Sequence, residues 1–275
     1  MIRQMTLGQY YKTDSVLHTL DPRVKLSGTM IFVISLFLPK SIPAMILATV
    51  FLFLIIRISK VPFSMIRRGI KPLMFIICFS AIVNLFCTKG HILIEFGPLH
   101  ITREGIILSA YLVIRLVYLI MGSSIMTFTT TPNELTDGLD KALHFLNRVH
   151  IPVHELAMMM SIALRFIPIL TEELDKIMKA QMSRGADFET GNLLQRAAKL
   201  IPLLVPLFIS AIRRASDLAL AMDARCYNGG EGRTKLKPLI YEKRDYVAYG
   251  ILLVYLIAMM ICSLVIGSKI SFGIK

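Results

Sequence analysis

The chain has 275 residues, 55% of them hydrophobic, and a formal net charge of +13 at pH 7. Soluble domains are less apolar, so this composition indicates an integral membrane protein. The basic excess does not favour nucleic-acid binding, because the aromatic residues lie inside apolar runs rather than among the basic residues. The four cysteines contain no C-x-x-C pair, so neither a metal site nor a disulfide framework is expected.

Residues 1–23 lack the short apolar core of a cleavable signal peptide, and this segment is expected to remain in the cytoplasm. Residues 24–128 are long enough for four transmembrane helices. We expect these helices at about 24–39, 42–57, 72–88 and 104–128.

An external loop is expected at 89–103, between the third and fourth spans. Its two short runs of β-favouring residues flank Gly97-Pro98, which is typical of a tight turn. The pattern predicts a small β-hairpin.

Residues 129–244 are expected to form a cytoplasmic block of amphipathic coupling helices, because apolar residues recur there at i, i+3 and i+4. Thr131 and Glu134 have the spacing of a capping box at the start of the first helix. The three helices are expected at about 132–147, 152–184 and 191–226. The second contains Arg165 and the third contains two prolines in its apolar stretch, which favours an interfacial position over membrane crossing.

Residues 245–275 are expected to form a final transmembrane helix, at about 246–267, and an external tail. With a cytoplasmic N-terminus, the cytoplasmic segments hold 25 lysines and arginines and the external segments hold five; Arg115 lies within a span. This asymmetry follows the positive-inside rule. The sequence therefore predicts an all-α, multi-pass membrane protein with about five transmembrane helices and a cytoplasmic helical block.

Both long helices of this block are expected to end with an arginine between small residues. The two ends are Ser183-Arg184-Gly185 and Ala224-Arg225-Cys226. One such end is explained by the helix dipole and a C-cap alone. Two matching ends favour a second interpretation, in which each guanidinium enters a groove of a partner and bonds to a carboxylate there.

These paired ends resemble the two Ala-Arg-Gly-type motifs of the transmembrane T component of energy-coupling-factor (ECF) transporters. The segments Gly8-Gln9-Tyr10 and 15–26 (SVLHTLDPRVKL) are similar to the opening signature of that family. The chain departs from the family pattern at Ser183, where alanine is usual, and at Cys226, where glycine is usual.

The resemblance implies that Arg184 and Arg225 each dock into one of two cytoplasmic ABC-type ATPase subunits, which bind ATP and Mg. It also implies that the apolar faces of the two long helices hold a separate substrate-binding membrane subunit, the S component. On these faces we expect contacts from Met159, Met160, Ile167, Leu204, Phe208 and Ile212. The transporter would import vitamins or other micronutrients, transition-metal ions among them, across a bacterial or archaeal cell membrane.

Other functions are less favoured. An intramembrane enzyme needs clustered carboxylates, nucleophiles or metal ligands, and no expected span has Asp, Glu or His in its interior. A stand-alone transporter needs more midplane polar residues than Asn84 and Arg115. No G-x-x-x-x-G-K-[ST] loop is present, so ATP hydrolysis is expected in a partner and the chain itself is expected to be non-catalytic, without a cofactor.

Overall fold

The computed structural model describes residues 10–38, 42–88, 90–96, 99–143, 145, 152–188, 190, 192–229 and 238–263. The chain divides into two compact units. The larger unit comprises residues 8–138 and 239–275, and the smaller comprises residues 1–7 and 139–238. Within the described ranges almost all regular structure is helical, which confirms the predicted all-α class.

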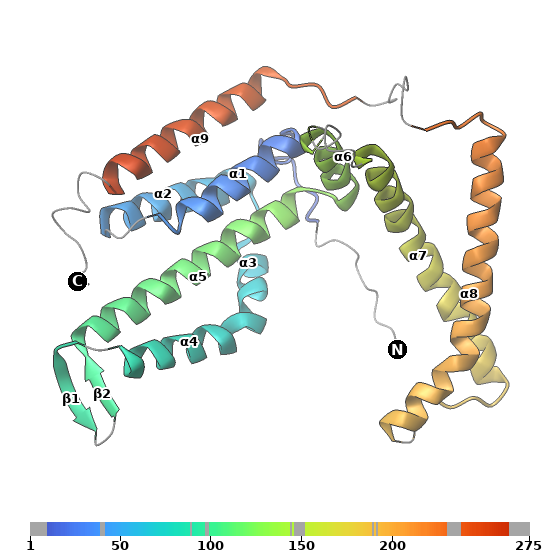
Figure 1. The fold of residues 1–275 in the computed structure, drawn as a ribbon, viewed down its shortest axis with the longest axis horizontal. Helices are drawn as coiled ribbons and strands as arrows, with labels where there is room; N and C mark the ends of the chain where they lie inside the picture. Colours follow the sequence, from blue (N-terminus) through green and yellow to red (C-terminus); the bar gives the residue numbers. More distant parts are fainter. Residues whose placement is uncertain are drawn as a thin grey trace. The chain divides into compact units, whose positions relative to one another are not determined.

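The larger unit is a helical bundle arranged around one long helix, α5 (Figure 1). Its helices are α1 (Pro22–Ser35), α2 (Ile42–Ser59), α3 (Phe63–Ile70), the 3₁₀ turn η1 (Lys71–Leu73), α4 (Met74–Cys87), α5 (Arg103–Thr129) and α9 (Lys243–Ile261). Helix α5 packs against α1, α2, α3 and α4, and α9 packs against α1 and α2. Segments far apart in the chain therefore share one core.

Aromatic side chains from three helices form the centre of this core. Phe51 of α2 and Tyr255 of α9 stack with ring centroids 3.9 Å apart, and Phe32 of α1 lies beside both rings. The buried hydroxyls of Ser35 and Tyr255 pair at 2.8 Å, which satisfies polar groups that would otherwise destabilise an apolar interior. Gly122 allows α5 to approach α1 closely, because a Cβ there would lie 2.6 Å from the Phe32 ring.

The loop between α4 and α5 contains the predicted hairpin. Strands β1 (Ile92–Phe96) and β2 (Leu99–Thr102) pair antiparallel, with Phe96 opposite Leu99. The turn residues 97 and 98 lie outside the described residues. The hairpin prediction is thus confirmed for the two strands.

Among the residues that the structure describes, five helical segments are long and apolar enough to cross a membrane: Ile42–Ser59, Phe63–Cys87, Arg103–Thr129, Val153–Ser183 and Lys243–Ile261. Four of them overlap the predicted spans. The first predicted span, 24–39, is only partly matched by α1, whose 14 residues reach about 21 Å, less than the roughly 30 Å of a hydrocarbon core. The fifth segment is α7, which the sequence pattern places at the membrane interface.

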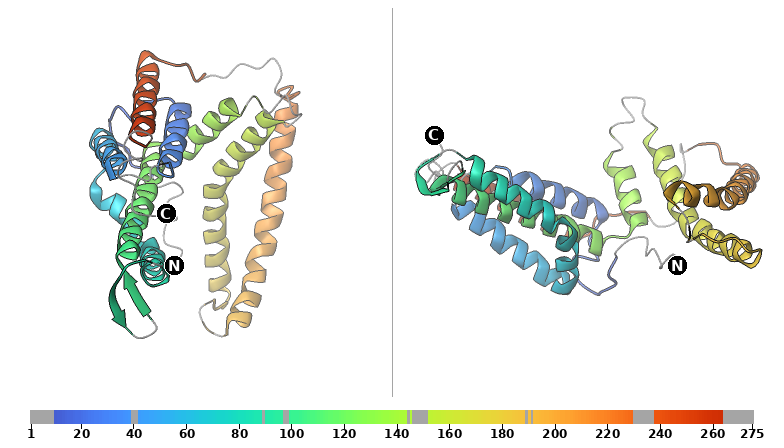
Figure 2. Two further views of the ribbon diagram at one scale, coloured as in Figure 1. Left: turned by 60° about the vertical axis from the view of Figure 1, so that its left-hand side comes forward. Right: turned by 90° about the horizontal axis from the view of Figure 1, so that it is seen from below.

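The smaller unit contains α7 (Val153–Ser183) and α8 (Leu193–Asp223), which lie side by side as a helical hairpin (Figure 2). Their bounds lie within one to three residues of the predicted 152–184 and 191–226. Each helix has 31 residues, a length of about 46 Å. Pro168 lies inside α7, and Pro202 and Pro206 lie inside α8, where each removes a backbone hydrogen bond.

Helix α6 (Pro132–Ala142) ends before the predicted 132–147, and residues 144 and 146–151 lie outside the described residues. Its N-terminus has the predicted capping box. The Glu134 N–H donates to Thr131 Oγ1 at 3.3 Å, and the Thr131 N–H donates to Glu134 Oε2 at 3.1 Å. This exchange satisfies two backbone donors at the helix start.

Candidate coupling site

Helix α7 ends in a C-cap whose last residue has a left-handed backbone conformation. Gly185 has φ +88°, and its N–H donates to the Met182 carbonyl at 3.0 Å. The Ala186 N–H donates to the Gln181 carbonyl at 3.0 Å. This pair of bonds is the Schellman motif, which satisfies carbonyls that a helix C-terminus leaves free. Arg184 is the residue immediately before the reversal.

The end of α8 repeats the same arrangement with a different left-handed residue. Cys226 has φ +55°, its N–H donates to the Asp223 carbonyl at 2.9 Å, and the Tyr227 N–H donates to the Met222 carbonyl at 3.0 Å. Arg225 therefore stands where Arg184 stands on α7. The Gly-to-Cys departure from the motif leaves the backbone of the cap unchanged.

Both arginine ends are open to solvent in the smaller unit. All six predicted docking residues are exposed: Ser183, Arg184, Gly185, Ala224, Arg225 and Cys226. Neither guanidinium forms an ion pair with any residue that the structure describes. Small neighbours leave each guanidinium accessible, so each can present its planar fork to a carboxylate of another protein.

An ion pair joins the two helices between these ends. Arg214 of α8 donates to Glu173 of α7 with Nη2 and Oε2 2.9 Å apart. Arg214 follows Glu173 by 41 positions, and Arg225 follows Arg184 by the same 41 positions. Each arginine end thus lies 11 residues, about 16 Å along its helix, beyond the ion pair.

The two arginine ends are placed alike with respect to this contact. Glu173 and Arg214 touch each other, and each of the two arginines follows one of them by 11 residues. Because the helices run in opposite directions, Arg184 and Arg225 point away from the contact along opposite directions. The site therefore offers two similar ends on either side of one ion pair.

Apolar side chains on the same helices are exposed in the described part of the smaller unit. The six predicted contact residues all expose between 39% and 67% of their surface. They are Met159, Met160, Ile167, Leu204, Phe208 and Ile212. Contiguous exposed apolar side chains mark a surface that another protein or a bilayer covers.

The family of the chain follows from its similarity to known proteins. Residues 13–236 match the model of the CbiQ family, described as cobalt transport protein. The chain belongs to the CbiQ family. It is 50% identical over 250 residues to the energy-coupling factor transporter transmembrane protein EcfT of Clostridium kluyveri, covering 90% of this chain and 93% of that protein.

Two further relatives have the same name. The EcfT of Thermosediminibacter oceani is 50% identical over 248 residues, covering 90% of this chain and 94% of that protein. The EcfT of Bacillus subtilis is 44% identical over 246 residues, covering 89% and 93%. The prediction of an ECF transmembrane component is confirmed, and this CbiQ-family chain is a multi-pass membrane protein of a transporter.

The opening signature of this CbiQ-family chain is a structural junction of the larger unit. Asp21 caps α1 by accepting from the Arg23 N–H at 2.9 Å, and it holds the Arg23 guanidinium through two further bonds. The Asp21 N–H donates to Asp245 Oδ1 at 2.9 Å, which ties α1 to the start of α9. Lys25 Nζ donates to the carbonyls of His18 and Thr129. Gly8 and Gln9 lie outside the described residues.

Tyr241 completes this junction from the segment before α9. The Arg23 guanidinium lies 3.8 Å from the Tyr241 ring centroid. Its hydrogen bond to Asp21 raises the pKa of Arg23 above the ordinary value. Burial, followed by a hydrogen bond with Tyr249, raises the pKa of Tyr241 to about 12. Both shifts keep Arg23 charged and Tyr241 neutral at pH 7.

The two polar residues that stand out in the predicted spans bond within their own helices. Arg115 donates to the Tyr111 hydroxyl at 2.8 Å, whereas the Asn84 side chain donates to the Ser80 carbonyl instead. His154 pairs with Asp140 at 3.6 Å, and no group of metal ligands occurs in the described part of the chain.

Sequence reasoning missed the Glu173–Arg214 pair. The same 41-residue offset separates Glu173 from Arg214 and Arg184 from Arg225, but no local pattern in the sequence indicates that the first pair touches.

Proposed function

We propose that this chain is the non-catalytic coupling subunit of an ATP-driven ECF-type uptake transporter. Two ABC-type ATPase subunits would dock at Arg184 and Arg225, and an S component would cover the exposed apolar faces of α7 and α8. The ATPases would bind ATP and Mg, and this chain would hold no cofactor. The cargo would be a vitamin or another micronutrient, including a transition-metal ion.

The observation that carries this proposal is the pair of matching helix ends about the Glu173–Arg214 contact. Two related ATPase subunits arranged around a twofold axis present the same groove twice. A hairpin whose two arginines have the same cap geometry and lie equally far from one contact fits such a pair. A single partner would have no need of two like ends.

The mechanism follows from the stiffness of the helices. When the two ATPases close on ATP, the grooves holding Arg184 and Arg225 move relative to each other. Helices of about 46 Å transmit this change to the region where they cross and to the apolar faces beside it. An S component seated on those faces would be tilted or released by the change. The exposed methionines at 159 and 160 suit a face that repacks during such movement.

The placement in the membrane is part of the same proposal. We place the N-terminus and residues 129–244 in the cytoplasm of a bacterial or archaeal cell, with residues 89–103 outside. The distribution of lysine and arginine supports this orientation. Helix α7 would lie at the interface, because its second half contains Glu172, Glu173, Asp175 and Lys176.

The decisive experiment reverses both docking charges. In the double variant Arg184→Glu with Arg225→Glu, insertion into the membrane should persist. ATPase co-purification and uptake should each fall at least about tenfold, since replacing one cation of a buried ion pair by an anion costs several kcal/mol. Lys176→Glu with Lys179→Glu is the matched control, because it makes the same charge change at exposed positions of α7. Undiminished ATPase recovery and uptake in the arginine double variant would refute the docking role.

A further inference from the structure

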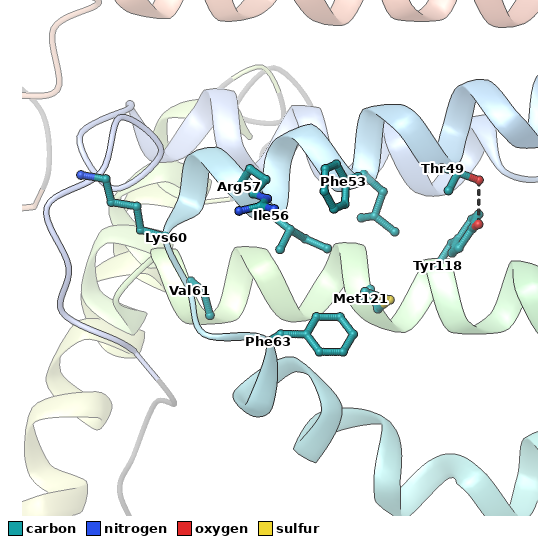
Figure 3. Close-up of a pocket in the computed structure, with 10 residues that line it drawn as sticks. Thr49, Phe53, Ile56, Arg57, Lys60, Val61, Phe63, Tyr118 and Met121 are labelled. Carbon is teal, nitrogen blue, oxygen red and sulfur yellow. Dashed lines mark hydrogen bonds between the residues drawn. The ribbon is translucent and has the colours of Figure 1, made fainter.

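A groove in the larger unit combines an apolar wall with unpaired positive charge. It lies between α2, α3 and α5 and has a volume of about 520 Å³, within the usual range of ligand sites. Figure 3 shows its lining residues: Phe53 and Ile56 of α2 stand on one side, and Phe63 and Met121 on the other. Arg57 and Lys60 line one end, where the Lys60 side chain extends outward from the groove, and the Thr49–Tyr118 hydrogen bond lies at the other end.

The two cations have no carboxylate partner among the described residues. Lys60 Nζ donates to the Asp14 backbone carbonyl at 3.1 Å, and Arg57 lies over the Phe53 ring at 5.2 Å. Both residues are exposed. No Asp or Glu occurs between Asp21 and Glu95, so the helices that carry this end contain no acidic residue. The end of the groove therefore has two cations, neither of them in an ion pair with a described residue, and Asp14, whose backbone Lys60 contacts, is an acidic residue close to it.

The backbone reverses direction at Lys60, immediately after α2. Lys60 has φ +53°, a left-handed conformation that glycine adopts at lower cost. Its neighbours Ser59 and Val61 are buried, at 0% and 5% exposure, so the reversal is fixed in place. Figure 3 shows the Lys60 side chain at the Arg57 end of the groove, with its ammonium group turned outward. This conformation ends α2, since the Lys60 N–H donates to the Arg57 carbonyl at 3.4 Å.

The next helix places this mouth at a membrane surface. In α3, Ile66 is fully buried while Arg67 and Arg68 are exposed, and Phe63 exposes 60% of its surface. A short helix with one apolar and one basic face lies in the headgroup region of a bilayer. The apolar wall formed by Phe53, Ile56 and Met121 then continues from headgroup depth toward the hydrocarbon region.

From this arrangement we infer that the groove binds one anionic phospholipid. Arg57 receives the headgroup phosphate, Lys60 adds positive charge at the same end of the groove, and one acyl chain lies along the wall toward Thr49 and Tyr118. The two cations match the phosphate of such a lipid, and the apolar wall of the groove matches its acyl chain. A zwitterionic lipid leaves the excess positive charge unneutralised, so it binds more weakly.

The test uses the absence of tryptophan from the chain. Phe63→Trp places a single fluorophore in the groove, and Phe75→Trp, on exposed α4, is the control reporter. The full-length chain is reconstituted in phosphatidylcholine vesicles containing brominated phosphatidylglycerol or brominated phosphatidylcholine. Position 63 should prefer the anionic lipid by about fivefold or more, as expected for contacts with one or two cations, and position 75 should show no preference.

Charge variants distinguish lipid binding in the groove from a general attraction of anionic lipids to the basic surface. Arg57→Gln with Lys60→Gln should abolish the preference at position 63, while Arg67→Gln with Arg68→Gln, which removes equal charge outside the groove, should leave it. Unchanged quenching by brominated phosphatidylcholine verifies insertion of each variant. Equal loss in both double variants, or equal quenching by the two lipids in the parent, overturns the proposal.

Two further measurements address other occupants. Adding 10 mM inorganic phosphate should leave the quenching unchanged, and loss of the preference would identify a free-anion site instead. A photocrosslinker at position 63 in native membranes should yield a lipid adduct, and a protein adduct in its place would assign the groove to a partner subunit. If either charge double variant fails to insert, native mass spectrometry of the parent decides: the proposal requires retained phosphatidylglycerol in excess over phosphatidylcholine.

Discussion

Cys226 occupies a backbone conformation that is costly for any residue with a Cβ. Its φ of +55° closes the Schellman motif of α8, and the matching position on α7 is Gly185 at φ +88°. A Cβ at Gly185 would meet nothing within 4 Å, so the difference between the two ends is backbone strain alone. Two caps with the same hydrogen bonds but different residues therefore form a matched pair for measuring this strain.

Cys226→Gly should stabilise the end of α8 by about 1 kcal/mol, because glycine adopts the left-handed region without Cβ strain. Cys226→Val should destabilise it by a similar or larger amount, since a β-branched residue is an outlier there. Hydrogen exchange of the amides at 226 and 227 measures this directly. Gly185→Ala is the control and should speed exchange at 185 and 186; equal exchange in the Val and Gly variants would contradict the strain argument.

The hairpin of α7 and α8 depends on a contact at its crossing. The Glu173–Arg214 pair is partly exposed, with side chains at 27% and 40%, so solvent screens it and its contribution to stability is at most about 1 kcal/mol. The Arg214 Nε is buried and has no partner among the described residues. The importance of the pair thus lies in fixing where the two helices meet rather than in overall stability.

Exchanging the charges tests this role. Glu173→Arg alone places two arginines together and should reduce uptake severalfold by shifting the crossing, and Arg214→Glu alone should do the same. The double exchange restores an attractive pair and should recover most of the uptake. Transport assays of the four proteins form a double-mutant cycle. Additive losses in the double variant would show that the pair does not set the crossing.

Most helices of this chain could be predicted from the sequence, for identifiable reasons. The 3.6-residue apolar period and the capping residues define α7 and α8 to within three residues. Helix α3 was missed because it has only eight residues and follows Pro62, although apolar Phe63, Ile66 and Ile70 beside Arg67 form an amphipathic pattern. The end of α1 at Ser35 was missed because the apolar run continues past it.

The candidate site was likewise only partly predictable from the sequence. Arg184 and Arg225 could be found because a small-Arg-small pattern is local and occurs twice. The Glu173–Arg214 contact and the link between Asp21 and Asp245 join residues 41 and 224 positions apart. Such pairs depend on tertiary packing, which periodicity does not specify. The 41-residue correspondence becomes meaningful only when the structure shows that its members touch.

At the scale of the whole molecule, the membrane topology depends on whether α7 crosses the bilayer. By length and composition it qualifies as a span, as do α2, α5 and α9. If α7 crossed the membrane, the loop after it and the charged residues of its second half would be carried outside. The cytoplasmic excess of lysine and arginine would then shrink, against the positive-inside rule. The interfacial placement keeps both arginine ends on the side where ATP is available.

Cysteine accessibility separates these two topologies. In a chain with Cys78, Cys87, Cys226 and Cys262 replaced by serine, Glu172→Cys and Thr190→Cys should resist a membrane-impermeant maleimide applied to intact cells and react after permeabilisation. Both positions are exposed in the smaller unit, so protection must come from the membrane barrier and not from burial.

His91→Cys, exposed in the segment that precedes β1, is the positive control and should react in intact cells. Labelling at 190 before permeabilisation would make α7 a span and place Arg184 on the external side. An arginine there has no access to a cytoplasmic ATPase, so this one measurement tests the membrane placement and the coupling role together.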